Sequence, residues 1–211
     1  MNFKNRIVNI DASNKCTLEC PKCMRQDYKR MGKKVPGGDL SIDNFNKLID
    51  YFNGACFCGQ ISDPIFNVNL IEFLKICKQK KKWCSVHTAA SHKKIEWYEE
   101  AFKANLDTEW IFGIDGLPHQ SFIYRVNQDG EKVFEMAKLA KKLGVKKVVW
   151  QYIVFGYNEK YIDEAKKLAL DNNILFELNI SGRWNLDNSY DPYRPKQSKN
   201  KLRGMHDKVE A

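Results

Sequence analysis

Three cysteines lie close together near the start of the sequence, in the stretch NKCTLECPKCMRQ (residues 14–26). Cys16, Cys20 and Cys23 follow the spacing C-x3-C-x2-C. Three thiolates on one loop are typical ligands of a [4Fe–4S] cluster. Since such a cluster has four irons, one iron would keep an open position for a small molecule. The spacing therefore predicts a cluster that is held by the protein and also binds a further ligand.

Two other interpretations of these cysteines are weaker. A structural zinc site needs four protein ligands, and the later candidates belong to other predicted βα units. Three buried structural thiols do not suit a polar loop that contains Lys15 and Lys22. The chain has seven cysteines, an odd number. In a reducing compartment this pattern favours metal or redox chemistry over disulfides. The later zinc-ligand candidates are Cys56, Cys58 and His87.

The composition is that of a globular protein with a basic surface. Of the 211 residues, 43% are hydrophobic, which is enough for a core. The sequence lacks both an apolar run of about 18 residues and an apolar signal stretch at its start. We therefore expect a cytoplasmic protein without membrane contact. The net charge of +9 leaves open an anionic partner such as nucleic acid, although most basic runs follow predicted helices and complement their C-terminal ends.

Short apolar runs alternate with helical patterns along the chain. Alternating βα units predict a parallel α/β sheet, and six strands are too few to close a standard eight-stranded barrel. We expect a partial (β/α)6 TIM-like barrel over residues 1–180 and an irregular polar tail over residues 181–211. Strands are predicted at residues 6–13, 55–60, 83–88, 109–116, 146–155 and 174–180. Helices are predicted at 41–52, 69–79, 92–105, 130–144 and 159–172, with Ser41 and Asn69 as caps of the first two.

Residues capable of chemistry follow the predicted strands. In parallel α/β folds the functional site lies at the carboxyl ends of the strands. The cysteine loop follows the first strand, so it should open onto a mouth shared with the later loops. Those later segments are GQISDP, HTAAS, DGLPHQSFIYR, GYN and SGRW.

The cysteine motif after the first strand of a βα series resembles the radical S-adenosylmethionine (SAM) superfamily, over residues 6 to about 180. In that family SAM chelates the open iron through its amino and carboxylate groups. An electron from the cluster splits SAM, and the 5′-deoxyadenosyl radical abstracts a substrate hydrogen. The resemblance implies a [4Fe–4S] cluster held by Cys16, Cys20 and Cys23, SAM as the second cofactor, and a one-electron donor such as flavodoxin or ferredoxin.

Further segments match the family in the same order. The segment ISDP stands where the family carries Gly-Gly-Glu-Pro, which implies that Ser62 and Asp63 hold the amino group of SAM; a turn residue before proline is the alternative for Asp63. The segment YRVN resembles the peptide-maturase branch and implies that Arg125 pairs with the SAM carboxylate, because an arginine fork matches a carboxylate. Gln151 and Asn158 would contact SAM or substrate, and helix capping accounts equally well for Asn158.

The chain also departs from the family pattern. Lys22 stands where an aromatic residue is common, Ala89 and Ala90 replace polar or glycine positions, and Gly113 stands where the maturase branch often has a SAM-contacting serine. No cysteine follows Cys84, so we expect a minimal core without the auxiliary-cluster domain of many maturases.

The substrate is the least constrained part of the function. The maturase-like segments favour a peptide or protein, and the positive charge favours a nucleoside or nucleic acid as the alternative. The competing class is a non-enzymatic, zinc-stabilised nucleic-acid-binding module. A third hypothesis is a degenerate core that keeps the cluster without catalysis.

The sequence contains three further sets of residues with a possible role at the site. Cys56 and Cys58 alternate on the second predicted strand and face the same side, and we interpret them as packing residues. His87 ends the third strand, where we expect a hydrogen-bonded neighbour of the site.

The aromatic residues of the tail predict either a loose terminus or a lid that docks over the mouth. These aromatic residues are Trp184, Tyr190 and Tyr193.

Overall fold

Six parallel strands form one continuous sheet. The computed structural model describes residues 6–181 and 193–196. The strands pair in chain order and every pair is parallel, with β1 and β6 at the two edges, so the sheet stays open. The bounds are β1 Ile7–Asn9, β2 Gly54–Cys58, β3 Trp83–Thr88, β4 Glu109–Gly113, β5 Lys147–Val154 and β6 Leu175–Ile180.

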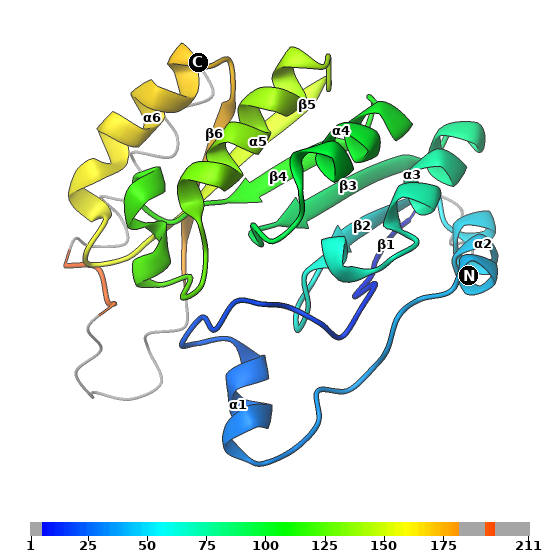
Figure 1. Ribbon diagram of the computed structural model, residues 1–211, viewed down its shortest axis with the longest axis horizontal. Coiled ribbons are helices and arrows are strands. Elements are labelled where there is room, and N and C mark those ends of the chain that lie inside the picture. Colours follow the sequence, from blue (N-terminus) through cyan, green and yellow to red (C-terminus); the bar gives the residue numbers. More distant parts are fainter. Residues whose placement is uncertain (1–5, 182–192, 197–211) are drawn as a thin grey trace.

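Helices connect the strands and cover one face of the sheet (Figure 1). The short helix α1, Met24–Arg30, stands apart from this layer and follows the cysteine loop. Short 3-10 segments precede three of the later helices, at Pro64–Phe66, Pro118–Ile123 and Glu159–Tyr161. The covering helices are α2 Ile42–Tyr51, α3 Leu70–Gln79, α4 Ile95–Ala104, α5 Gly130–Lys142 and α6 Ile162–Asp171.

The predicted partial (β/α)6 barrel is confirmed, with local differences at the ends of elements and at α1. The first strand ends at Asn9 rather than at residue 13. Helix α1 was not predicted, because none of its residues is buried and it therefore has no apolar period. Ser41 caps α2 as expected, since its side chain accepts a hydrogen bond from the Asn44 N–H. Asn69 precedes α3 but makes no capping hydrogen bond with its side chain.

The hydrophobic core lies between the sheet and the helices. Phe57, Phe112 and Trp150 project into it from β2, β4 and β5, and all three are fully buried. Full burial of one such side chain contributes about 1.5–3 kcal/mol, so this face supplies most of the hydrophobic stabilisation. The indole N–H of Trp150 donates to the Ile114 carbonyl at 2.8 Å, which satisfies its polar atom.

The other face of the sheet is more polar. Successive side chains of a strand point to opposite faces. In β2, Cys56 and Cys58 are half-buried on either side of the buried Phe57, and His87 in β3 and Gln151 in β5 lie between buried neighbours in the same alternation. These residues therefore line the inner, concave face of the partial barrel.

Asn67 fixes the chain segments around the cysteine loop. Its side chain is buried, with 1% exposure. Its Nδ2 donates to the carbonyls of Ala12, at 2.5 Å, and Leu40, at 3.1 Å. Its Oδ1 accepts from the N–H of Asn69 at 2.7 Å. One amide thus joins the chain after β1, the start of α2 and the start of α3.

None of the helices within residues 6–181 and 193–196 has the length and apolar character that a membrane crossing requires.

Replacing Asn67 by alanine should lower the free energy of unfolding by about 2–4 kcal/mol, because one buried and two partly buried backbone groups each lose a hydrogen bond. The measurement is urea denaturation followed by far-UV circular dichroism. Asn69→Ala is the matched control, since the Asn69 side chain donates only one long hydrogen bond, of 3.4 Å, to the Leu40 carbonyl. Equal losses in the two variants would contradict the role of Asn67.

Candidate active site

One pocket gathers residues from the carboxyl ends of five strands. It is lined by all three cysteines of the loop after β1, and by residues from the loops after β2, β3 and β4. Every site residue predicted from the sequence lines it except Asn158. The lining residues considered below are Cys16, Cys20, Cys23, Arg25, Cys58, Gly59, Ser62, Asp63, His87, Ala89, Gly113, Arg125 and Gln151.

The three cysteines of the loop face this pocket as free, half-buried thiols. The N–H of Cys23 donates to the Cys20 carbonyl at 3.0 Å, which folds the C-x2-C segment into a turn. Burial, and secondarily Asp63, raises the pKa of Cys16 to about 12, and burial raises the pKa of Cys20 to about 11. Thiols in this environment ionise when a cation replaces the proton, as in metal ligation. Three convergent thiols therefore fit the predicted cluster.

Arg25, on α1, ties the cysteine loop to the loop after β2. Its Nη1 donates to the carbonyls of Asn14, at 2.6 Å, and Ile61, at 2.9 Å. Sequence reasoning missed this residue, because an arginine in a helix without an apolar period looks like a solvated side chain. Its position two residues after the last cysteine was the only available signal.

The loop after β2 is tightly folded. A Cβ atom at Gly59 would lie 1.9 Å from the Ser62 carbonyl oxygen, so this position requires glycine. The Ser62 hydroxyl donates to Asp11 Oδ1 at 3.0 Å, and the Ile61 N–H donates to the same oxygen at 3.2 Å. Ser62 thus lines the pocket while its hydroxyl proton is already used within the protein.

Asp63 is buried and its carboxylate holds the loop after β3. Oδ2 accepts from the N–H groups of Ala89 and Ala90, at 2.9 and 3.0 Å, and Oδ1 accepts from the Thr88 hydroxyl at 2.9 Å. Burial raises the pKa of Asp63, and these donors act against that rise. Both oxygens therefore position the strand β3 loop, and the contact of Asp63 with SAM stays a prediction.

Arg125 is fixed by a buried ion pair. Its Nε lies 2.8 Å from Asp115 Oδ2, and the exposed fractions of the two side chains are 13% and 0%. Burial alone would lower the pKa of Arg125, but the Asp115 carboxylate outweighs it and the net direction is upward. Within the described residues, Nη1 and Nη2 of Arg125 make no hydrogen bond. These two nitrogens remain available to a carboxylate in the pocket.

Gly113 makes room for this guanidinium. A Cβ at Gly113 would approach Arg125 Nη2 to 2.7 Å and Cζ to 2.9 Å. The serine that the maturase branch often carries at this position would therefore collide with Arg125 as it lies here. Glycine at position 113 therefore removes the serine contact with SAM and, at the same time, leaves space for the Arg125 guanidinium.

Gln151 and Asn158 have different environments. Gln151 lines the pocket from β5 and its side chain makes no hydrogen bond within the described residues, so it can still meet a ligand. Asn158 is fully buried. Its Oδ1 accepts from the Phe155 N–H at 2.7 Å and its Nδ2 donates to the Ile153 carbonyl at 2.9 Å. Asn158 thus closes the turn after β5 without helix capping, and a ligand contact by Asn158 stays a prediction.

Gln128 is a positioning residue that the sequence did not reveal. Its buried Nε2 donates to the carbonyls of Ala89, at 2.6 Å, and Gly113, at 2.8 Å, while Oε1 accepts from the Ser121 hydroxyl. It joins the ends of β3 and β4 at the pocket wall. Gln128 could not be recognised from the sequence, because a glutamine in a polar segment looks like an ordinary surface residue.

Cys56 and Cys58 are not core packing residues, contrary to the interpretation from the sequence. Both are half-buried on the concave face, and with His87 their ligand atoms all lie within 4.8 Å of one another. Contact with Cys58 lowers the pKa of Cys56 to about 4, and the same contact raises the pKa of Cys58. Packing was expected because free cysteine is often buried, but the strand alternation places this pair on the face opposite the helices.

One described segment of the tail reaches the pocket side of the protein. Tyr193 packs against Tyr124 and Phe155, with ring centroids 5.3 and 6.3 Å apart, in a cluster that also includes Cys20. The Tyr193 carbonyl accepts from the Gly156 N–H at 2.9 Å. Trp184 and Tyr190, the other two predicted lid residues, lie outside the described residues.

Comparisons with known proteins agree with this fold. Residues 10–169 match the family model described as the Radical SAM superfamily. The structure of SuiB from Streptococcus suis has a TM-score of 0.69 at 16% identity, over 99% of this chain and 46% of that chain. Native anSMEcpe with bound AdoMet, which is SAM, has a TM-score of 0.66 at 16% identity, over 89% of this chain and 55% of that chain. SuiB is also known bound to S-adenosylmethionine and to the precursor peptide SuiA.

These similarities have defined limits. No curated protein sequence matches the chain. The chain spans about half the length of the solved structures above, and at 16% identity they show a shared fold. The family model, in contrast, matches most of the sequence, including the three cysteines and the loops after β2, β3 and β4. The chain belongs to the radical SAM superfamily, whose cofactors are a [4Fe–4S] cluster and SAM.

Proposed function

We propose that this protein binds a [4Fe–4S] cluster through Cys16, Cys20 and Cys23 and uses SAM for radical hydrogen abstraction from a peptide or protein. The observation that carries the proposal is the convergence of the three thiols with Arg125 and Gln151 in one pocket. When bound, the cluster supplies the electron that splits SAM into methionine and the 5′-deoxyadenosyl radical.

The protein's own residues supply binding and orientation. Arg125 offers Nη1 and Nη2 to the SAM carboxylate, and Asp115 holds the guanidinium in place through Nε. Gln151 offers an amide to SAM or to the substrate from β5. Asp63 and Gln128 fix the loop after β3 through hydrogen bonds to its backbone, which preorganises this part of the pocket wall. Ser62 and Asp63 remain the candidates near the SAM amino group.

A peptide or protein is the favoured substrate class. Two of the structural neighbours are known in complex with peptides: SuiB with the precursor peptide SuiA, and anSMEcpe with the Cp18Cys peptide. A nucleoside or nucleic acid is the alternative, supported by the net charge of +9. Flavodoxin or ferredoxin remains the predicted electron donor, and the cytoplasm the predicted location.

Replacing Cys20 by alanine should abolish the visible iron–sulfur absorbance after anaerobic reconstitution, because the cluster loses one of three thiolate ligands. Cys77→Ala is the matched control: Cys77 is fully buried on α3, in the core. We expect this variant to keep about four irons per chain. An unchanged spectrum in Cys20→Ala would remove Cys20 from the ligand set.

A second measurement tests catalysis. Formation of 5′-deoxyadenosine by the parent protein under reducing conditions would distinguish an active enzyme from a degenerate core that only binds the cluster.

Replacing Arg125 by lysine should weaken SAM binding about 10- to 100-fold, or about 1.5–3 kcal/mol, because the bidentate donor is lost while the positive charge beside Asp115 remains. The measurement is an anaerobic SAM titration of the reconstituted protein. Arg30→Lys, an exposed change on α1, is the control. Equal affinity in Arg125→Lys and parent would place the SAM carboxylate elsewhere.

The same titration resolves the role of Asp63. Asp63→Ala should lower SAM affinity and also the free energy of unfolding, because the N–H groups of Ala89 and Ala90 lose their acceptor. A loss of affinity at unchanged stability would indicate direct contact with the SAM ammonium group, and unchanged affinity would remove Asp63 from the site.

We propose further that Tyr193 belongs to a lid over the mouth. Tyr193→Ala should keep the cluster and increase the incorporation of deuterium into 5′-deoxyadenosine formed in D2O with dithiothreitol, because the exchanged S–D groups of this thiol gain access to the radical. Tyr51→Ala, at an exposed tyrosine on α2, is the control. Equal deuterium incorporation in the Tyr193 variant and parent would show that this segment is not a lid.

A further inference from the structure

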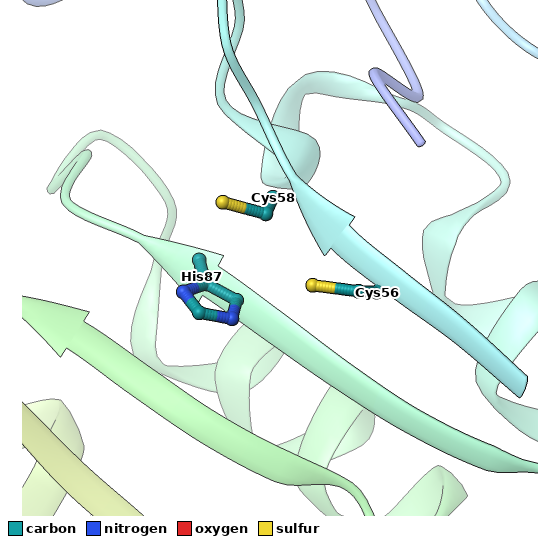
Figure 2. Close-up of side chains that lie close together, drawn as sticks. All are labelled: Cys56, Cys58 and His87. Atoms are coloured by element: carbon teal, nitrogen blue, oxygen red, sulfur yellow. The ribbon is translucent and has the colours of Figure 1, made fainter. Parts of the chain in front are cut away.

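A second group of metal-binding side chains lies on the concave face of the sheet. Figure 2 shows Cys56 and Cys58 extending from β2 toward His87 on the neighbouring strand β3. The two sulfurs and one imidazole nitrogen all lie within 4.8 Å of one another. None of the three has a role in the cluster or SAM contacts proposed above.

The sheet itself sets this geometry. Cys56 and Cys58 are two residues apart in one strand, so their side chains share a face. His87 is the register partner of Cys58 in the parallel pair β2–β3, so it lies directly beside that cysteine. Because strand backbones rather than a loop hold all three residues, the group is preorganised.

The donor set suits a zinc-type cation. Two thiolates and an imidazole are borderline-soft ligands of the kind that Zn²⁺ takes. Tetrahedral coordination with Zn–S near 2.3 Å and Zn–N near 2.0 Å puts ligand atoms about 3.5–3.8 Å apart. The ligand atoms lie within 4.8 Å of one another, so metal binding would bring them closer by up to about 1 Å.

A disulfide between Cys56 and Cys58 fits the geometry less well. Two residues along a strand span about 6.6 Å between Cα atoms, near the upper limit for a disulfide. The sulfurs would have to approach to about 2.05 Å while the strand kept its pairing on both sides. A metal ion bridges the same pair without that distortion.

Ser85 provides an independent observation. It is the register partner of Cys56 and is 1% exposed. Its hydroxyl makes no hydrogen bond to a nitrogen or oxygen atom among the described residues, and its interaction with the Cys56 sulfur lowers the pKa of that thiol. Buried hydroxyl groups normally have a partner. A metal-bound thiolate at Cys56 would supply a strong acceptor for this hydroxyl, as outer groups around metal ligands commonly do.

The group also opens toward the candidate active site. Cys58 and His87 line the pocket that contains the cysteine triad and Arg125. Zinc sites with three protein ligands keep a fourth position for water or substrate, whereas structural sites use four protein ligands. A ligand in that fourth position would thus lie in the same pocket as SAM.

We propose that Cys56, Cys58 and His87 bind one zinc-type divalent cation, whose fourth coordination position accepts an anionic sulfur or oxygen donor of the substrate. Metal binding stands independently of the proposed function, whereas the anchoring of the substrate rests on it. The bound cation would hold one group of the substrate in the pocket and thereby determine which substrate hydrogen lies in position for abstraction.

The first test measures metals in the full chain after anaerobic reconstitution with iron, sulfide and Zn²⁺, followed by gel filtration. We expect about four irons and one zinc per parent chain. Cys58→Ser and His87→Gln should lose the zinc and keep the iron, and Cys77→Ala should keep both. Iron content reports on the proposed function and zinc content on this inference, so the two can fail separately. Zinc retained in Cys58→Ser and His87→Gln, or absent from the parent, would overturn the site.

The second test uses Co²⁺ in a chain that carries Cys16→Ser, Cys20→Ser and Cys23→Ser, so that the cysteine loop cannot compete. We expect one Co²⁺ with thiolate-to-cobalt charge-transfer bands, and an affinity lower by about 100-fold or more after Cys56→Ser. Thioglycolate carries a thiolate and a carboxylate, so its binding at the fourth coordination position of Co²⁺ should shift the charge-transfer bands. Unchanged bands would show that no fourth position is open to such a ligand. Circular dichroism verifies that each variant is folded.

A third measurement addresses the competing redox chemistry. Intact mass of the parent purified without reductant should show that Cys56 and Cys58 remain reduced and that Zn²⁺ protects them from alkylation. A loss of two mass units assigned to a Cys56–Cys58 disulfide in the presence of Zn²⁺ would overturn the metal site in favour of a redox pair.

Discussion

Parallel pairing in unbroken chain order is the constraint on which the whole site depends. Because each strand runs in the same direction, every loop that follows a strand emerges at one edge of the sheet. Residues separated by more than a hundred positions, such as Cys16 and Gln151, thereby line one pocket. The helices cover the other face and bury the large aromatic side chains, so the concave face is free to carry polar and metal-binding groups.

Buried polar side chains then fix the loops to one another. Asp63 holds the loop after β3, Gln128 joins the ends of β3 and β4, and Asn67 joins the chain after β1 to α2 and α3. A buried polar group left unpaired costs about 1–3 kcal/mol, so each of these bonds opposes rearrangement of a loop. Side chains thus hold the backbone groups that form the pocket wall, and Arg125 and Gln151 are the residues that we propose to meet ligands.

Much of this arrangement could be predicted from the sequence, and the exceptions have physical causes. Apolar periodicity placed all six strands and five helices, because those elements bury one face. It could not find α1, which buries none of its residues. The cysteine triad and Arg125 were identified by their order along the chain and do meet in one pocket. Asn158 and Gln128 show the limit: whether an amide binds a ligand or a backbone carbonyl depends on contacts between loops, which local sequence does not encode. Cys56 and Cys58 were correctly placed on one side of a strand, but the side they face depends on where the helices pack.

The open edges of the sheet have a consequence for the kind of molecule that can reach the pocket. A closed cylinder admits only what fits end-on through its rim. In an arc whose first and last strands do not pair with each other within the described residues, no strand ladder closes the wall between β6 and β1. The sheet by itself therefore does not require a polymer substrate to thread a free terminus through a rim.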